Sequence, residues 1–117
     1  MASDIEALTK LVQNFCEDRD WDQFHPPKDL AIGISTEANE LLDLFRFKTD
    51  EVVKEKLKTE QFKERVSEEI ADVLFFVLRF SQMNSIDLSQ ALQEKLKKNA
   101  IKYPVETSKG SNRKYNE

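Results

Sequence analysis

Hydrophobic positions recur at helical spacing in four segments of the chain, and highly polar segments separate them. Apolar residues spaced by three or four positions are typical of helices that bury one face. The pattern therefore predicts an all-α protein, with helices from the Ser3–Glu6 capping pattern to about residue 18, over about 28–47, over about 61–83 and from Leu88 to about residue 102. The charged segment 48–60 is expected to form a surface connection with some helical turns.

The second half of the third predicted helix, within EEIADVLFFVLRF, is apolar on nearly all sides. Such a helix is covered on several faces, so we expect it to pack against other helices or a second subunit. Asp72 lies inside this stretch, although an ionised carboxylate is costly in apolar surroundings. Arg65 and Arg79 are the basic residues within two helical turns of it. A bound divalent cation is therefore the hypothesis for what compensates Asp72.

Four carboxylates share this arrangement. Glu37 and Glu40 are three positions apart on the second predicted helix, and both point with its apolar stripe. Glu69 and Asp72 repeat the spacing on the third. Antiparallel packing of the two helices would gather all four groups, which repel one another unless cations bind or protons are taken up. All-oxygen ligation suits Mg²⁺, with Mn²⁺ as the alternative.

A di-iron centre and a plain solvated surface are the alternatives to this cation site. A di-iron carboxylate bundle requires a Glu-x-x-His pair from each of two helices, whereas the single histidine, His25, lies in a predicted loop. Acid pairs at this spacing are also common on solvated helix faces, and Glu37 with Glu40 alone fits a solvated face equally well. The pair embedded in the apolar third helix fits a solvated face poorly, which favours the cation.

Composition and charge narrow the class of protein. The chain has 117 residues, which favours one domain with a modest core, and only 2 Gly and 3 Pro, which favours helix. A net charge of −4 disfavours broad contact with nucleic acid or acidic membranes. The sequence contains no apolar run of the length that a membrane-spanning helix needs. The single cysteine, Cys16, and an acidic N-terminus lead us to expect a cytoplasmic protein without a secretory signal.

Several separated segments resemble one known family. EANELLDLF, EEIADVLFFVL and KLKKNAIKYP are similar to the all-α nucleoside triphosphate pyrophosphatases of the MazG-like superfamily, and RDWDQFHPP and YPVETSKGSNRKY resemble its dCTP pyrophosphatase branch. The resemblance implies a MazG-like four-helix bundle formed with subunit pairing, in a dimer or a dimer-of-dimers tetramer. We expect this domain to cover residues 1–104 and a polar C-terminal tail to cover residues 105–117.

The resemblance also implies a reaction. It is the Mg²⁺-dependent hydrolysis of a (deoxy)nucleoside triphosphate, dCTP or a modified dCTP, to the monophosphate and pyrophosphate, which serves nucleotide-pool sanitation. The E-x-x-E and E-x-x-D signature of the family falls here on Glu37, Glu40, Glu69 and Asp72, which the resemblance makes the metal ligands. The metal would polarise the phosphates and lower the pKa of the attacking water. Glu40 is our choice for the general base.

Aromatic residues are assigned to the nucleotide base. The resemblance implies that Trp21 stacks on the base with His25 nearby, although Trp21 also fits an aromatic cap on the core and a lone histidine is often structural. Phe47 and Phe76 align with a Trp and a Tyr of the dCTP-preferring members. Each keeps a ring but loses a hydrogen-bond donor, which leaves the base preference open.

Basic and polar residues share the inward face near the end of the fourth predicted helix. Lys95, Asn99 and Lys102 lie within an arc of about 60° around the helix axis, and Tyr103 follows. This spacing predicts contacts with the phosphates of a nucleotide. Lys102 fits a solvated last turn equally well, because a cation there interacts favourably with the helix dipole.

Two further functions stay open. In the first, the same fold serves an enzyme that acts on dUTP or on a broad set of non-standard triphosphates. In the second, the chain is a non-catalytic helical interaction module whose acidic residues pair with a basic partner.

Overall fold

The computed structural model describes residues 4–117, and these residues form helices and connecting turns with no strand among them. The helices are α1 (Ile5–Asp18), α2 (Pro27–Asp43), α3 (Asp50–Leu57), α4 (Glu60–Met83), α5 (Leu88–Lys102) and the single turn α6 (Val105–Ser108), with a short 3₁₀ helix η1 (Asp22–Phe24) before α2. The all-helical fold predicted from the sequence is confirmed. None of the helices in this described range has the length and apolar character needed to cross a membrane.

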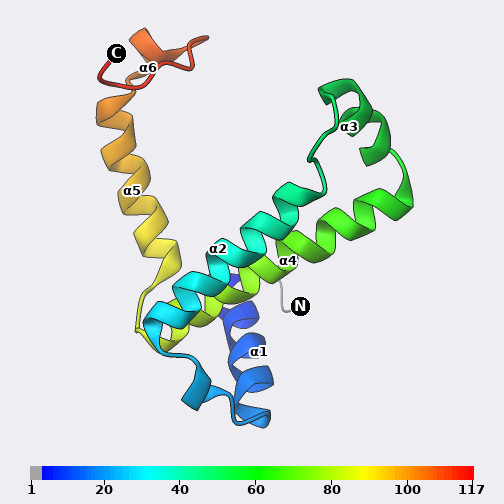
Figure 1. Ribbon diagram of the computed structural model, residues 1–117. Coiled ribbons are helices and arrows are strands. Elements are labelled where there is room, and N and C mark those ends of the chain that lie inside the picture. The colour runs from blue at the N-terminus through cyan, green and yellow to red at the C-terminus, as the bar shows by residue number, and fades with distance from the viewer. Residues whose placement is uncertain (1–3) are drawn as a thin grey trace. The chain divides into compact units, whose positions relative to one another are not determined.

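The chain divides into two compact units, one that ends at Ser85 and one that begins at Ile86. In the first unit, α2 and α4 run side by side in opposite directions and form its most extensive helix contact, with α1 and α3 also packed on α4 (Figure 1). The expected antiparallel pairing of the two acid-bearing helices is therefore present. The predicted division of the chain after residue 104 stays a prediction.

The core of the first unit is small. Its buried apolar side chains come from α1, α2, α4 and the turn after α2, and they are Cys16, Leu30, Leu44, Phe62 and Leu78. Two aromatic edge-to-face contacts extend it, between Phe15 and Phe75 at 6.0 Å and between Phe45 and Phe62 at 6.0 Å. Part of the apolar surface of α4 stays uncovered, since Ile70 is 50% exposed and Leu74 is 39% exposed.

Local sequence signals set most helix boundaries. α2 begins at Pro27, whose fixed backbone suits the first helical turn, and Thr49, Thr59 and Asp87 cap α3, α4 and α5 by accepting a backbone N–H. The N-cap of α1 is Asp4, which accepts from the N–H of Ala7 at 2.7 Å, whereas the expected cap Ser3 lies outside the described residues.

The predicted second helix is too long at its C-terminal end. α2 ends at Asp43, and the chain turns through residues 44–47 before α3 begins. Phe47 has φ 63°, in the left-handed region that a right-handed helix does not use. Because Phe47 is apolar and fits the helical spacing, the sequence pattern predicted a helix end four residues beyond the observed end at Asp43. The segment 48–60 carries the helix α3, as expected for a connection with helical turns.

The second unit consists of α5, α6 and the segment that follows. Tyr103 packs edge-to-face on Tyr115 at 5.9 Å, and the ammonium group of Lys102 lies 4.8 Å from the centre of the Tyr115 ring. These contacts fold the C-terminal segment back on the end of α5. They surround a polar pocket of about 200 Å³, whose lining includes Lys102, Arg113 and Lys114.

Candidate functional site

Three of the four predicted carboxylates meet between α2 and α4. Glu37 and Glu40 are on one face of α2 because they are three residues apart, and Glu69 faces them from α4. One oxygen of each of these three side chains lies within 4.8 Å of the others. The helix packing therefore concentrates negative charge at one place, as the sequence predicted for these three residues.

Two oxygens of this cluster have no partner in the described part of the chain. The Oε2 atoms of Glu37 and Glu69 are buried and accept no hydrogen bond there. Burial, followed by the negative charge of Glu40, raises the pKa of both carboxyl groups, and Asp72 adds to the effect. A carboxylate left in this state is destabilising unless a cation or a proton joins it. The arrangement of oxygen donors fits a hard divalent cation.

Asp72 departs from the prediction. Its side chain is exposed rather than surrounded by apolar groups, and it lies outside the group of three carboxylates. The reason is its place on α4, about 60° around the helix from Glu69, at the edge of the face that packs on α2. Asp72 still acts on the cluster through its charge, since it raises the pKa of Glu37 and Glu69. Its role as a metal ligand stays a prediction.

A pocket of about 440 Å³ adjoins the carboxylates, and Glu37 is part of its wall. Trp21 and His25, on either side of η1, line it together with Phe76 of α4. The Trp21 ring contacts the His25 ring edge-to-face, with centroids 6.1 Å apart. Three of the four residues assigned to the base thus line one pocket beside the acidic cluster, together with residues of α2 that the sequence did not single out, including Asp29, Gly33 and Thr36.

The Phe76 wall of this pocket depends on Gly33. A Cβ atom at Gly33 would lie 2.5 Å from Cε1 of Phe76 and 2.6 Å from Cδ1, far inside carbon–carbon contact distance. Because Gly33 has no side chain, the Phe76 ring can lie directly against the backbone of α2. The only sign of this in the sequence is a glycine within an otherwise regular helical pattern.

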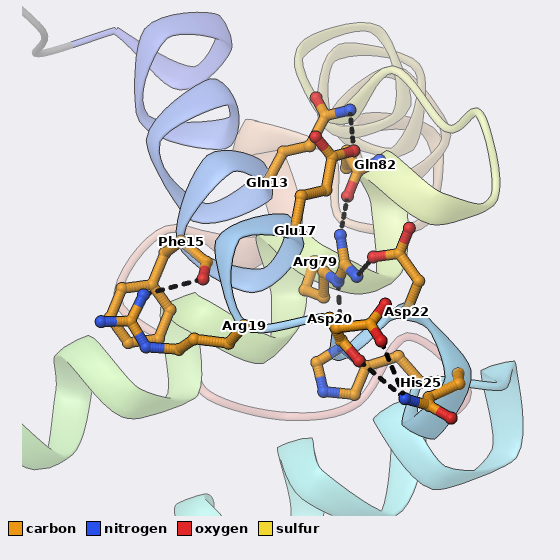
Figure 2. A network of polar contacts seen from close by, with 10 residues as sticks. Gln13, Phe15, Glu17, Arg19, Asp20, Asp22, His25, Arg79 and Gln82 are labelled. Atoms are coloured by element: carbon orange, nitrogen blue, oxygen red, sulfur yellow. Dashed lines mark hydrogen bonds and ion pairs between the residues drawn. The ribbon is translucent and has the colours of Figure 1, made fainter.

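Arg79 organises the loop side of the pocket. Its side chain is fully buried and donates from Nε to Nδ1 of His25 at 2.9 Å and from one terminal nitrogen to Gln82 at 2.7 Å (Figure 2). The other terminal nitrogen forms an ion pair with Asp22 of η1. Sequence reasoning treated Arg79 as a neighbour of Asp72 and missed this network. The available signal was a single arginine within an apolar run.

The remaining predicted site residues are placed apart from this pocket or in the other unit. Phe47 is 92% exposed and is not among the residues that line the pocket, and the guanidinium of Arg46 lies 4.6 Å from the centre of its ring. The four residues predicted to contact phosphates all belong to the second unit, where Asn99 is half-buried and the other three are exposed: Lys95, Asn99, Lys102 and Tyr103. Their role stays a prediction.

The fold and the site define a class: an all-helical protein with an acidic cluster between antiparallel helices, beside a pocket lined by aromatic side chains. The model of the MazG-like family matches residues 32–117, most of the chain. The chain therefore belongs to the MazG-like family, which confirms the resemblance read from the sequence.

Similar proteins agree with this assignment. The chain is 33% identical over 111 residues to dCTP pyrophosphatase 1 of Bos taurus and 32% identical over 113 residues to dCTP pyrophosphatase 1 of Homo sapiens. These alignments cover 95% and 97% of this chain but 66% of each relative, so the chain spans about two thirds of their length. A solved pyrophosphatase from Archaeoglobus fulgidus superposes with a TM-score of 0.79 at 37% identity, over 86% of this chain and 92% of the other.

Proposed function

We propose that this chain hydrolyses a nucleoside triphosphate, dCTP or a modified dCTP, to the monophosphate and pyrophosphate. The observation that carries the proposal is the pair of buried, unpartnered carboxylate oxygens of Glu37 and Glu69 beside a pocket with aromatic walls. A divalent cation would compensate this pair, and at that place it would lie next to a pocket that fits a nucleotide base. The similarity to proteins named dCTP pyrophosphatase 1 supports the same reaction class and base.

In this proposal the acidic cluster binds Mg²⁺, with Mn²⁺ as the alternative. Glu37, Glu40 and Glu69 would hold the ion, and Asp72 is the fourth predicted ligand at the edge of the site. Bound there, the ion supplies neutralisation of the phosphate charge and makes a water molecule more acidic. The chain itself contributes the positions of the carboxylates, which are set by two rigid helices rather than by loops.

The reaction is a substitution at the α-phosphorus. The oxygen of water forms a bond to the α-phosphorus. The bond between the α-phosphorus and the oxygen that bridges it to the β-phosphorus breaks, and pyrophosphate leaves. Glu40 accepts the proton of the water at its carboxylate, because its side chain is exposed, whereas Glu37 and Glu69 are half-buried and each has one buried oxygen without a partner. Positioning and charge neutralisation supply most of the acceleration for this kind of transfer.

The aromatic pocket binds the base in this proposal. Trp21 and Phe76 provide flat apolar surfaces for stacking, and His25 provides a polar group at the same wall. Lys95, Asn99, Lys102 and Tyr103 are retained as predicted phosphate contacts, and Phe47 as a predicted base contact. Phe76 offers a ring without a hydrogen-bonding group, which favours a second candidate of broader base preference that includes dUTP.

We further propose that a second copy of the chain covers the apolar surface of α4. Ile70 and Leu74 are exposed on the helix that carries Glu69, and a four-helix arrangement formed by two subunits would bury them. Light scattering after gel filtration tests this, since a monomer at micromolar concentration would contradict it. Ile70→Glu should shift the protein toward smaller species, with Lys63→Glu as the exposed control on the same helix.

Pyrophosphate release from a panel of triphosphates, with Mg²⁺ and with EDTA, tests the activity. We expect release from dCTP with Mg²⁺ and none with EDTA. Comparable rates with dUTP and other bases would favour the broader enzyme. No release from any triphosphate would favour the non-catalytic interaction module and would refute the proposal.

A further inference from the structure

The burial of Arg79 has to be compensated. Its side chain has no exposed surface, and a guanidinium cannot lose its proton at any pH that a folded protein experiences. Each of its three nitrogens has a partner: His25 for Nε, Gln82 for one terminal nitrogen and Asp22 for the other. The Asp22 side chain is 54% exposed and supplies the opposite charge. The network therefore satisfies a buried cation and ties the η1 loop to α4.

The direction of the bond to His25 determines where the imidazole carries its proton. Nε of arginine is a donor and never an acceptor, so Nδ1 of His25 must present a lone pair. A neutral imidazole that accepts at Nδ1 carries its hydrogen on Nε2. In Figure 2 the imidazole lies next to the guanidinium, with its second nitrogen on the side of the ring away from Arg79.

The Nε2–H group is free to bind a ligand. His25 lines the pocket of about 440 Å³ together with Trp21 and Phe76. In residues 4–117 no protein group is hydrogen-bonded to Nε2, which contrasts with the fixed partner of Nδ1. A donor held at a pocket wall in one orientation is the kind of group that reads an acceptor atom of a ligand.

We propose that Arg79 is a positioning residue, which holds the His25 imidazole as the Nε2–H tautomer so that it donates a hydrogen bond to an acceptor atom of the bound base. The tautomer follows from the network alone. The contact with the base rests on the proposed function, because it requires a nucleotide in the pocket.

The charges around His25 agree with a neutral ring. Burial lowers its pKa, and the adjacent Arg79 guanidinium lowers it further, while Asp22 acts in the opposite direction. Asp29 and Glu37 of α2 line the same pocket. A second proton, on Nδ1, would point at the Nε–H of Arg79 and break the hydrogen bond, so the geometry and the charge oppose it together.

Nuclear magnetic resonance tests the tautomer without any substrate. His25 is the single histidine of the chain, so long-range proton–nitrogen spectra of the ring need no assignment. We expect a protonated Nε2 and an unprotonated Nδ1 at pH 7.5. In Arg79→Met the preference should relax to a mixture of tautomers, whereas Arg65→Met, an exposed arginine on the same helix, should leave the spectrum unchanged. A protonated Nδ1 in the wild-type protein would overturn the proposal.

Two substitutions of His25 separate its two nitrogens. His25→Asn keeps an acceptor near the Nδ1 position for Arg79 and lacks the distal donor, whereas His25→Gln places an amide donor near the Nε2 position. We expect His25→Asn to keep more of the thermal stability than His25→Gln does. We expect His25→Gln to keep more of the affinity for dCTP than His25→Asn does. KM for dCTP should rise about tenfold in Arg79→Met and His25→Asn with little change in kcat.

The outcomes are distinguishable from failure of the proposed function. If no triphosphate is hydrolysed while Nε2 is protonated, the enzyme proposal fails and the role of Arg79 in setting the tautomer holds. If dCTP is hydrolysed and KM is the same in the wild-type protein, Arg79→Met and His25→Asn, the role of Arg79 in reading the base is refuted. A fall in kcat alone, with KM unchanged, also contradicts it.

Discussion

Replacing Gly33 with alanine should move the Phe76 ring into the pocket. The new Cβ would lie 2.5 Å from Cε1, 2.6 Å from Cδ1 and 2.9 Å from Cζ of that ring. Ordinary contact between carbon atoms begins near 3.5 Å, so the ring must withdraw by about 1 Å. The rigid backbone of α2 cannot yield as easily as a side chain at the edge of a pocket, so the ring should be the part that moves.

The size of the stability change follows from two opposing effects. Alanine in place of glycine within a helix stabilises by about 1 kcal/mol, whereas overpacking costs about 1–3 kcal/mol. The net change in the free energy of unfolding should therefore lie between about 0 and −2 kcal/mol. Ser35→Ala is the matched control, since Ser35 is exposed on the same helix, and it should stabilise by a few tenths of a kcal/mol.

Urea unfolding and steady-state kinetics check both parts of this prediction. Gly33→Ala should raise KM for dCTP several-fold, because the displaced ring narrows the pocket, and Ser35→Ala should not. The double variant Gly33→Ala, Phe76→Leu should regain the stability lost, because the smaller side chain leaves room for the Cβ. A full gain of about 1 kcal/mol in Gly33→Ala, with KM unchanged, would refute the contact between Phe76 and α2.

Two further substitutions test the acids and the base preference. The raised pKa of Glu37 and Glu69 means that metal-free protein loses stability as the pH rises above their ordinary value of 4.5 through the folded-state pKa. Glu69→Gln should therefore raise the melting temperature in EDTA at pH 8 and leave it nearly unchanged at pH 4; an equal change at both would contradict the repulsion. Phe76→Tyr adds a hydrogen-bonding group to the pocket and should increase the preference for dCTP over dUTP in kcat/KM by about tenfold, while an unchanged ratio would show that the base does not reach this wall.

Helical periodicity predicted the fold class because the signal is local. α1, α4 and α5 begin with a side chain that caps the helix, and each contains apolar residues at regular helical spacings. The predicted helix reached Phe47 because this residue is apolar and at helical spacing. The hydrophobic pattern contains no information on its left-handed φ. The helix end depends on backbone geometry that the hydrophobic pattern does not contain.

The carboxylate cluster was predictable in part. Three acids were located correctly because an i,i+3 spacing places Glu37 with Glu40 on one helix face, and antiparallel packing brings Glu69 to it. The apolar surroundings predicted for Asp72 were wrong, because its side chain is exposed and its apolar sequence neighbours point to other sides of α4. Which side of α4 faces solvent depends on the packing of α2, and the sequence pattern does not contain that packing. The residues next to Asp72 in the sequence therefore did not indicate the environment of its side chain.

The Arg79 network was not predictable from periodicity at all. Its partners Asp22 and His25 are 57 and 54 positions away in the chain, in a loop with no regular pattern. A buried arginine needs partners, so the arginine itself indicates that polar groups approach α4 from elsewhere. Which groups approach is decided by where the η1 loop crosses the helix.

Thermal unfolding with increasing Mg²⁺ is the most direct test of the central claim, that Glu37, Glu40 and Glu69 hold a divalent cation. The wild-type protein should be stabilised by about 2.7 kcal/mol when Mg²⁺ reaches 100 times its dissociation constant. Glu68→Gln, a change at the exposed neighbouring acid, should keep this dependence, and Glu69→Gln should lose most of it. Equal stabilisation of the wild-type protein and Glu69→Gln, or none in the wild-type protein, would contradict the account.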